Sequence, residues 1–219
     1  MPLSDDADFK HSSVFLLPDQ GGDNYVAVKN SAVGAWGTVC GTIGYSSGKH
    51  YFELRPITGA TATSSVAMLG IASEAAVVAD SQVRYWNHTE GYGYNADGKV
   101  YTNSTNAAYG ATFDYPDIIG VAVDLDNGFL YFAKNNTYQN SGVPTSGSSG
   151  TGAAASLESS TVFYPAMGLP NDGACCILVE IASLFSYSPP SGYSAWNPDT
   201  LDEGGGSPII IPQLVVPQL

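Results

Sequence analysis

The fold of this sequence is constrained most by its short apolar runs, which alternate with a period of two and are separated by turn residues. Such alternation is typical of antiparallel strands that bury one face and expose the other. The alternating sets are His50, Phe52 and Leu54; Ile119, Val121, Val123 and Leu125; and Cys175, Ile177, Val179 and Ile181. Only residues 73–82 have the composition of a helix, with Ser73 as its N-cap. The pattern therefore predicts an all-β antiparallel sandwich.

A strand pair is expected over residues 118–135, where two alternating runs flank an Asp-Asn-Gly turn at 126–128. Asn-Gly is typical of a two-residue type I′ turn, since both central residues need a positive φ. A second turn at Lys134–Asn136 is expected to end the second strand. The Gly- and Ser-rich residues 141–156 predict a flexible surface loop inside the domain.

Charge and the length of the apolar runs exclude two classes of partner. The 219 residues include 20 acids and 7 bases, which gives a net charge of −13. Nucleic-acid binding needs a basic surface, and these bases are scattered singly along the chain. No apolar run reaches the ~20 residues of a membrane span, and the acidic N-terminus does not resemble a signal peptide. We therefore expect neither nucleic acid as a partner nor membrane insertion.

The three cysteines, Cys40, Cys175 and Cys176, include no C-x-x-C pair. This spacing predicts neither a disulfide framework nor a zinc site, and it is typical of a chain made in reducing cytosol. Cys175 and Cys176 are neighbours in a predicted strand and face opposite sides. One of them is therefore expected to pack as a small hydrophobic residue.

Short motifs that resemble catalytic or ligand-binding signatures each fit a structural explanation better. Ser46 stands in a G-x-S-x-G pattern, but a nucleophile elbow needs a helix next and a strand follows here. Residues 91–96 imitate a dinucleotide fingerprint with no helix after them, and residues 124–128 fit a hairpin better than a calcium loop. Asp114 and Asp117 flank a predicted turn. We predict no catalytic residue, metal site or cofactor.

A series of motifs rich in glycine and aromatic residues runs along the chain. They are Gly34–Val39, Ser47–Glu53, Leu69–Ser73, Gly91–Gly98, Ala108–Gly110, Asp117–Asp126, Leu130–Phe132, Phe163–Leu169 and Tyr187–Tyr193. In order and spacing they resemble the SPRY domain, particularly the reduced versions in bacteriophage structural and tail-fibre proteins. The resemblance covers about residues 15–197. It implies a bent sandwich of two antiparallel sheets and a non-enzymatic binding module that contacts partners through loops at one rim.

Residues 80–90 depart from the family pattern and resemble an insertion. Aromatic faces together with amide groups suit contacts with sugars or peptide backbones. The residues predicted to contact a partner are Tyr85, Trp86, Asn87, His88, Tyr101 and Asn103. The alternative, that these aromatic residues serve packing, stays open. Tyr92, Tyr94 and Tyr109 lie within stretches that match the family and are expected in the core.

The chain ends in a segment outside the family pattern, with a flexible joint at Gly204–Gly206 followed by residues 208–219, the C-terminal arm. Its prolines exclude a helix or a central strand but allow an edge strand or polyproline geometry. The large aliphatic residues of the arm are Ile209, Ile210, Ile211, Leu214, Val215, Val216 and Leu219. They predict an extended arm that docks on another polypeptide. The predicted division is an N-terminal lead at 1–12, a SPRY-like sandwich at 13–198 and a linker with the assembly arm at 199–219.

Two functions remain open at this point, with a hydrolase based on Ser46 as a third and weaker hypothesis. The first is a phage virion protein of the capsid or tail, made in the host cytoplasm. Its arm would bind other virion proteins or sibling subunits, and its rim loops a host surface glycan or protein. The alternative is a cellular SPRY adaptor in the cytoplasm that binds a short peptide through its rim loops.

Overall fold

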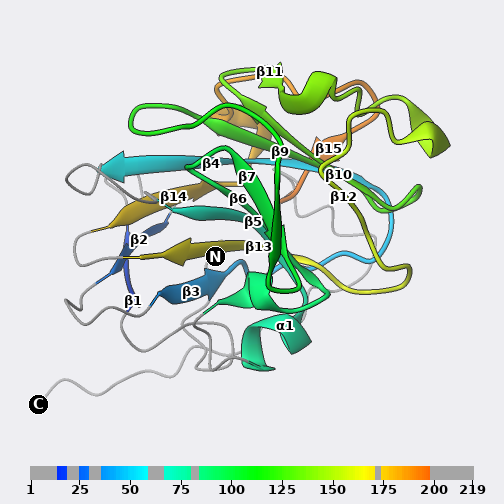
Figure 1. The fold of residues 1–219 in the computed structure, drawn as a ribbon. Helices are drawn as coiled ribbons and strands as arrows, with labels where there is room; N and C mark the ends of the chain where they lie inside the picture. Colours follow the sequence, from blue (N-terminus) through cyan, green and yellow to red (C-terminus); the bar gives the residue numbers. More distant parts are fainter. Residues whose placement is uncertain are drawn as a thin grey trace, which may run out of the picture.

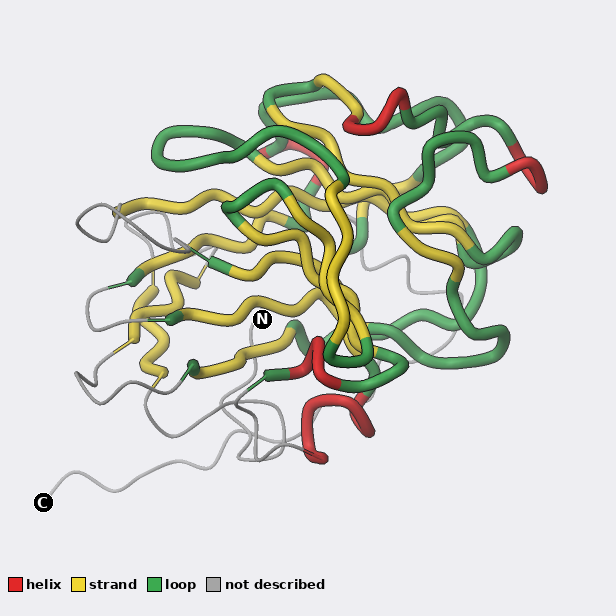
Figure 2. The backbone as a smooth tube through the Cα atoms, in the orientation of Figure 1, coloured by secondary structure: helices red, strands yellow, loops and turns green. Residues whose placement is uncertain are grey.

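The computed structural model of the chain describes residues 14–18, 25–29, 36–58, 67–79, 84–170 and 174–197. Strands and loops make up most of these residues, and helix is confined to short turns (Figure 2). The strands are β1 Val14–Pro18, β2 Tyr25–Lys29, β3 Gly37–Cys40, β4 Lys49–Thr58, β5 Met68–Ala72, β6 Gly91–Asn95, β7 Lys99–Thr102, β8 Thr105–Ala108, β9 Ile119–Asp124, β10 Phe129–Lys134, β11 Thr137–Tyr138, β12 Ala155–Ser156, β13 Tyr164–Leu169, β14 Cys175–Val179 and β15 Ser194–Ala195. The helices are α1 Glu74–Ala79 and the 3₁₀ turns η1 Tyr85–Asn87, η2 Gln139–Ser141, η3 Gly147–Ser149 and η4 Ala182–Leu184.

The described strands form two sheets. The nine-stranded sheet has the order β1-β2-β14-β4-β9-β10-β11, with β12 paired to β10 and β15 parallel to β4. The six-stranded sheet has the order β3-β13-β5-β6-β7-β8, and all its pairs are antiparallel. Figure 1 shows α1 on one side of the molecule and β11 on the opposite side. The predicted all-β antiparallel sandwich is confirmed.

The main core lies between the two sheets, and the alternating residues of the sequence supply much of it. Phe52 and Leu54 of β4 are fully buried there, as are Ile119, Val121 and Val123 of β9. β4 pairs with β9 from Lys49 opposite Asp124 to Leu54 opposite Ile119, so the apolar faces of the two strands coincide. The period-two pattern thus predicted the inward side of both strands.

On β14 the inward residues are Cys176 and Leu178, which belong to the core between the sheets. These residues have the opposite parity to the set from Cys175 to Ile181 that the sequence singled out. Cys176 is fully buried and burial raises the pKa of its thiol, whereas Cys175 is half-buried. The expectation that one of the two cysteines packs as a small hydrophobic residue is therefore confirmed.

Two further apolar clusters cover the outer faces of the sheets. Tyr51, Ala122, Tyr131 and Tyr193 form one on the nine-stranded sheet, with half-buried Phe129 beside them. Met68, Ala72, Val77, Tyr85 and Trp86 belong to the other, where α1 and η1 lie on the six-stranded sheet. Each sheet is thus packed on both of its faces.

The prediction of a type I′ turn at Asn127-Gly128 is wrong. Turns with positive φ at both central residues occur at two other strand connections. A four-residue loop joins β9 to β10, and within it only Gly128 has a positive φ, of 74°. The Asp124 carboxylate holds this longer loop by accepting hydrogen bonds from the backbone and side-chain amides of Asn127. Two-residue turns with positive φ at both positions instead join β10 to β11 at 135–136 and β7 to β8 at 103–104.

The helix α1 begins directly after Ser73, as the sequence predicted. The Ser73 Oγ accepts a hydrogen bond from the Ala76 N–H at 3.1 Å, which satisfies one of the free donors at the helix start. Ala76 and Val77 are buried against the outer face of the six-stranded sheet, and Val78 is 45% exposed. Packing on one face thus stabilises a helix too short to persist alone.

The Gly- and Ser-rich residues 141–156 follow a defined path across the nine-stranded sheet. The Ser146 Oγ accepts a hydrogen bond from the Thr151 N–H at 3.0 Å, and the Ser146 carbonyl accepts one from the Ser149 hydroxyl at 2.8 Å. The Tyr193 hydroxyl donates to the Pro144 carbonyl at 2.9 Å and fastens the loop to the outer cluster. The composition predicted a loop correctly, but not that local hydroxyl groups give it this conformation.

The C-terminal arm, with Ile209, Ile210, Ile211, Leu214, Val215, Val216 and Leu219, lies outside the described residues, as do the lead at 1–12 and the joint at Gly204–Gly206. The predicted boundaries of the sandwich, 13 and 198, also fall on residues outside the described ranges. The arm and the domain division therefore stay predictions.

Candidate functional site

The predicted contact residues Tyr85 and Trp86 lie on η1, which packs against the outer face of the six-stranded sheet. Tyr85 is fully buried, and its hydroxyl donates a hydrogen bond to the Met68 carbonyl at 3.2 Å. The Trp86 ring is 5% exposed and meets the ring of Trp36 edge-on, with the centroids 4.8 Å apart. The structure corrects the expectation that Tyr85 faces a partner, because its side chain does not reach solvent. Only a narrow edge of Trp86 does.

Two glycines of the sheet leave room for these rings. A Cβ at Gly168 would lie 2.5 Å from Cζ3 of Trp86, and a Cβ at Gly93 would lie 2.6 Å from the Met68 sulfur. A Cβ at Gly93 would also lie 3.0 Å from the Tyr85 hydroxyl oxygen. A larger residue at either position would therefore push the η1 side chains away from the sheet. The close packing of η1 gives these glycines a structural role.

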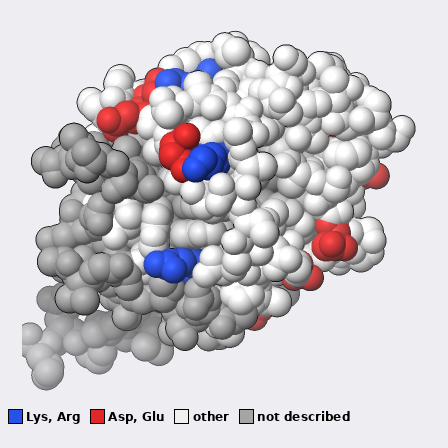
Figure 3. Space-filling view, in the orientation of Figure 1, with Lys and Arg blue, Asp and Glu red and all other residues white. Residues whose placement is uncertain are grey.

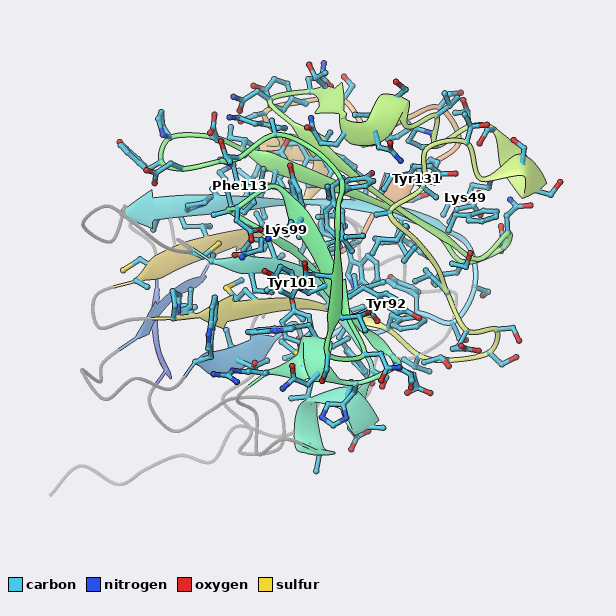
Figure 4. All side chains as sticks on the ribbon, in the orientation of Figure 1. Lys49, Tyr92, Lys99, Tyr101, Phe113 and Tyr131 are labelled. Atoms are coloured by element: carbon cyan, nitrogen blue, oxygen red, sulfur yellow. The ribbon has the colours of Figure 1, made fainter. Side chains whose placement is uncertain are left out.

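A hollow of about 230 Å³ opens beside Trp86 on this face, and we call it the η1 hollow. Its lining residues are Trp36, Met68, Arg84, Trp86, Asn87, Asn95, Tyr101 and Ser104. Figure 4 labels Tyr101, which comes from β7 at the front of the view. The surface drawn in the same orientation is mostly uncharged, with charged atoms in small separate groups (Figure 3). Of the predicted contact residues, Trp86, Asn87 and Tyr101 come together here.

His88 and Asn103, the remaining predicted residues, are not in the lining, but their backbones hold it in place. The Asn103 N–H donates to the His88 carbonyl at 3.1 Å, and the Ser104 N–H donates to the Trp86 carbonyl at 3.3 Å. The Ser104 hydroxyl also donates to the Asn87 carbonyl at 3.3 Å. The type I′ turn of β7–β8 is thereby tied to η1, so the two sides of the hollow are connected.

Sequence reasoning missed Trp36, Arg84 and Asn95 as lining residues. Trp36 and Asn95 belong to stretches that were assigned to the fold, and only the pairing of the strands brings them to one face. Arg84 directly precedes Tyr85 in the segment 80–90, which the sequence sets apart from the family pattern. Its place beside the predicted contact residues was the one signal available for it.

The lining of the η1 hollow is rich in aromatic residues and mainly uncharged. Arg84, which is exposed, is its charged lining residue, and Trp36, Trp86 and Tyr101 give it aromatic walls. The Tyr101 hydroxyl donates to Asp97 at 3.0 Å; desolvation by burial, and then this hydrogen bond, raise the pKa of the phenol. The residues of the lining include no carboxylate, histidine or cysteine that could act as a general base.

The short motifs that resemble catalytic signatures, at Ser46 and at Asp114 and Asp117, have structural roles in the described residues. Ser46 stands in the bend before β4, so a strand follows it and the elbow geometry does not form. Asp117 accepts hydrogen bonds from the Asp114 N–H and from the Asn135 side chain, and it pairs with Lys134 at 2.9 Å. Desolvation acts to raise the pKa of Asp117, but these donors lower it below its usual value. Hydrogen bonds and an ion pair therefore stabilise the charged form of Asp117 in this turn.

In the part of the chain that the structure describes, no group of three His, Cys, Asp or Glu side chains is placed to hold a metal ion. None of the described helices is long and apolar enough to cross a membrane.

The sequence profile of the SPRY domain matches residues 49–180, which is more than half of the chain. The chain belongs to the SPRY domain family. Among curated proteins, the dual specificity protein kinase splA of Dictyostelium discoideum is 31% identical over 137 residues, which are 60% of this chain and 5% of that kinase. The chain thus spans about one twentieth of the length of that relative.

Solved structures of SPRY domains agree with the fold. The SPRY domain of human HERC1 has a TM-score of 0.56 and 16% identity, and it covers 80% of this chain and 96% of its own. A second human SPRY domain has the same TM-score and identity, over 77% of this chain and 95% of its own. The predicted SPRY resemblance is confirmed at the level of family and fold.

Proposed function

We propose that this SPRY domain binds a short peptide segment of a partner protein in the η1 hollow. A SPRY domain is typically a non-enzymatic interaction module. The observation that carries the proposal is the hollow itself, in which aromatic walls from Trp36, Trp86 and Tyr101 surround a small space beside one exposed arginine. Its volume of about 230 Å³ lies below the ~300–1,000 Å³ of most small-molecule sites. One inserted side chain suits this space better than a whole cofactor.

The cellular adaptor is the form of this function that the relatives support. The reported relatives are a Dictyostelium kinase and human SPRY domains. An adaptor that binds a peptide in the cytoplasm needs only the described sandwich and its hollow. The aromatic and amide groups of the lining would suit a host glycan as well as a peptide, and membership of the SPRY family favours the peptide.

Replacing Tyr101 with alanine is expected to weaken peptide binding by at least tenfold while the melting temperature stays nearly unchanged. Tyr101 is half-exposed, so its loss removes a wall of the hollow without opening the core, and aromatic anchors of this kind cost ≥ ~2 kcal/mol when truncated. The probe is a peptide selected on the full chain from a displayed library of random peptides. Its affinity is measured by calorimetry.

The matched control is Tyr115→Ala, which removes a tyrosine that is 59% exposed and is not part of the hollow. If both variants bind the selected peptides as the unchanged chain does, the hollow is not the binding site. Trp86 is a poorer choice for this test. It is 5% exposed, so its truncation would leave a cavity and lower stability as well as binding.

A virion-associated role remains our second proposal, and the C-terminal arm is the observation that favours it. Seven large aliphatic residues among the twelve at 208–219 would face water at a considerable cost if nothing covered them. We expect the arm to dock on other virion proteins or on sibling subunits, either as an edge strand or in an apolar groove.

Deleting residues 204–219 is expected to leave a folded monomer that no longer assembles. Because we expect the arm to dock on another polypeptide and not on its own sandwich, the truncated chain should still unfold cooperatively. Light scattering after gel filtration compares the masses of the full and truncated chains. A truncated chain that assembles like the full one would remove the support for an anchoring arm.

A further inference from the structure

Arg84 is held at the mouth of the η1 hollow by the backbone of η1. Its carbonyl accepts a hydrogen bond from the Asn87 N–H at 3.0 Å, and Tyr85, the next residue, is fully buried. The side chain of Arg84 is exposed and lines the hollow together with Trp36 and Trp86. A fixed backbone thus presents a cation beside the aromatic walls.

Arg84 differs from the other basic side chains that the structure describes. Each of the others lies within ion-pair distance of a carboxylate: Lys49 at 2.7 Å from Asp124, Arg55 at 2.7 Å from Glu53, Lys99 at 3.4 Å from Asp97, and Lys134 at 2.9 Å from Asp117. Within the described residues, Arg84 has no such partner. In a chain with 20 acids against 7 bases, a cation at a hollow that pairs with none of the described carboxylates can serve a partner.

The chemistry of Arg84 and its walls defines what would occupy the site. A guanidinium group offers a planar set of donors that matches a carboxylate in two parallel hydrogen bonds. The aromatic edges of Trp36, Trp86 and Tyr101 favour a large apolar side chain. Because the chain has a net charge of −13, a strongly acidic partner would be repelled at long range. A single carboxylate within an otherwise uncharged segment avoids most of that repulsion.

We infer that the partner segment places one large apolar side chain in the η1 hollow and a neighbouring carboxylate on Arg84. This inference rests on the proposed function, since it assumes that a peptide occupies the hollow. It adds the chemical class of that peptide, a short segment with an apolar anchor and one acidic group. The acidic group is an Asp or Glu side chain or a terminal carboxylate.

The test selects binders to the full chain from a displayed library of random twelve-residue peptides. We expect the selected peptides to share an acidic residue at a fixed spacing from a Trp, Phe, Leu or Met. For a synthetic copy of one such peptide, Arg84→Gln should weaken binding roughly tenfold. Changing the acidic residue of the peptide to its amide should weaken it equally, and combining both changes should cost little more than either alone.

The matched control is Lys134→Gln, which removes the same charge from a side chain outside the lining. An equal loss with Lys134→Gln would show a general effect of charge and overturn the inference. So would selected peptides without a shared acidic residue, or acidic sugars that bind the hollow where peptides do not. The peptide-side change leaves the domain untouched, so the test holds even if an Arg84 variant is unstable.

Failure of the inference can be told apart from failure of the proposed function. If Tyr101→Ala abolishes binding of the selected peptides while Arg84→Gln and the amide peptide leave it unchanged, the hollow binds peptides and only the carboxylate contact is wrong. If Tyr101→Ala has no effect either, the peptides bind elsewhere and both fail.

Discussion

Replacing Phe132 with alanine is expected to lower the free energy of unfolding by about 3–5 kcal/mol. Phe132 of β10 is fully buried between the sheets, opposite Val121 of β9. Its ring stacks on Tyr94 of the six-stranded sheet with the centroids 5.2 Å apart, so it joins the two sheets directly. Truncation removes buried apolar surface and leaves a cavity that rigid neighbouring rings fill poorly. Urea denaturation of both chains measures the loss.

Phe129→Ala is the matched control on the same strand. A hairpin that crosses the core would be expected to bury Phe129 as well as Val121, but Phe129 is half-buried and belongs to the outer cluster with Tyr131. Truncation of Phe129 should lower the free energy of unfolding by about 1–2 kcal/mol. Equal losses for the two phenylalanines would contradict the inward and outward assignment of β10.

The strands could be predicted because alternation of side chains is a local property of the sequence. His50–Leu54 and Ile119–Leu125 show their inward faces without any knowledge of their partners. The types of the turns were harder to predict. Asn-Gly at 127–128 carries the strongest hairpin signal, yet the Asp124 carboxylate captures the Asn127 amide and lengthens the loop. Competition from one side chain therefore decided the turn type.

The site could be predicted only in part, because its walls come from distant strands. The departure of residues 80–90 from the family pattern pointed to Trp86 and Asn87, and the aromatic-rich stretch pointed to Tyr101. Whether an aromatic residue faces a partner or the sheet depends on the opposing residue. Gly168 lies far from η1 in the sequence, and Gly93, although close to η1 in the sequence, belongs to the separate strand β6. Their lack of side chains lets Tyr85 and Trp86 sink against the sheet. No local pattern around Tyr85 reports this.

Glu180 shows how strand parity places a charged group in the core. It follows Cys176 and Leu178 at the end of β14 with the same parity, so its side chain continues their inward face. The side chain is 1% exposed, and among the described residues neither carboxylate oxygen has a hydrogen-bond partner. Its backbone is fixed, because the Glu180 carbonyl accepts the Asn197 N–H at 3.0 Å. Burial raises the pKa of this carboxyl from its ordinary 4.5 to about 8.

Glu180→Gln is expected to make the chain more stable relative to wild type as the pH rises from 4.5 to 8. In this window the folded chain keeps the Glu180 proton and the unfolded chain has lost it. Wild-type unfolding then releases a proton, so the contribution of Glu180 to stability is complete below pH 4.5 and is lost as the pH approaches 8. The neutral amide carries no such penalty. The difference in unfolding free energy between variant and wild type should grow by up to about 1.4 kcal/mol per pH unit and then level off.

Urea midpoints measured from pH 4 to 9 give this difference, and Glu158→Gln, which changes an exposed glutamate, is the control. A difference that stays constant with pH for Glu180→Gln would mean that the buried carboxylate titrates like an exposed one.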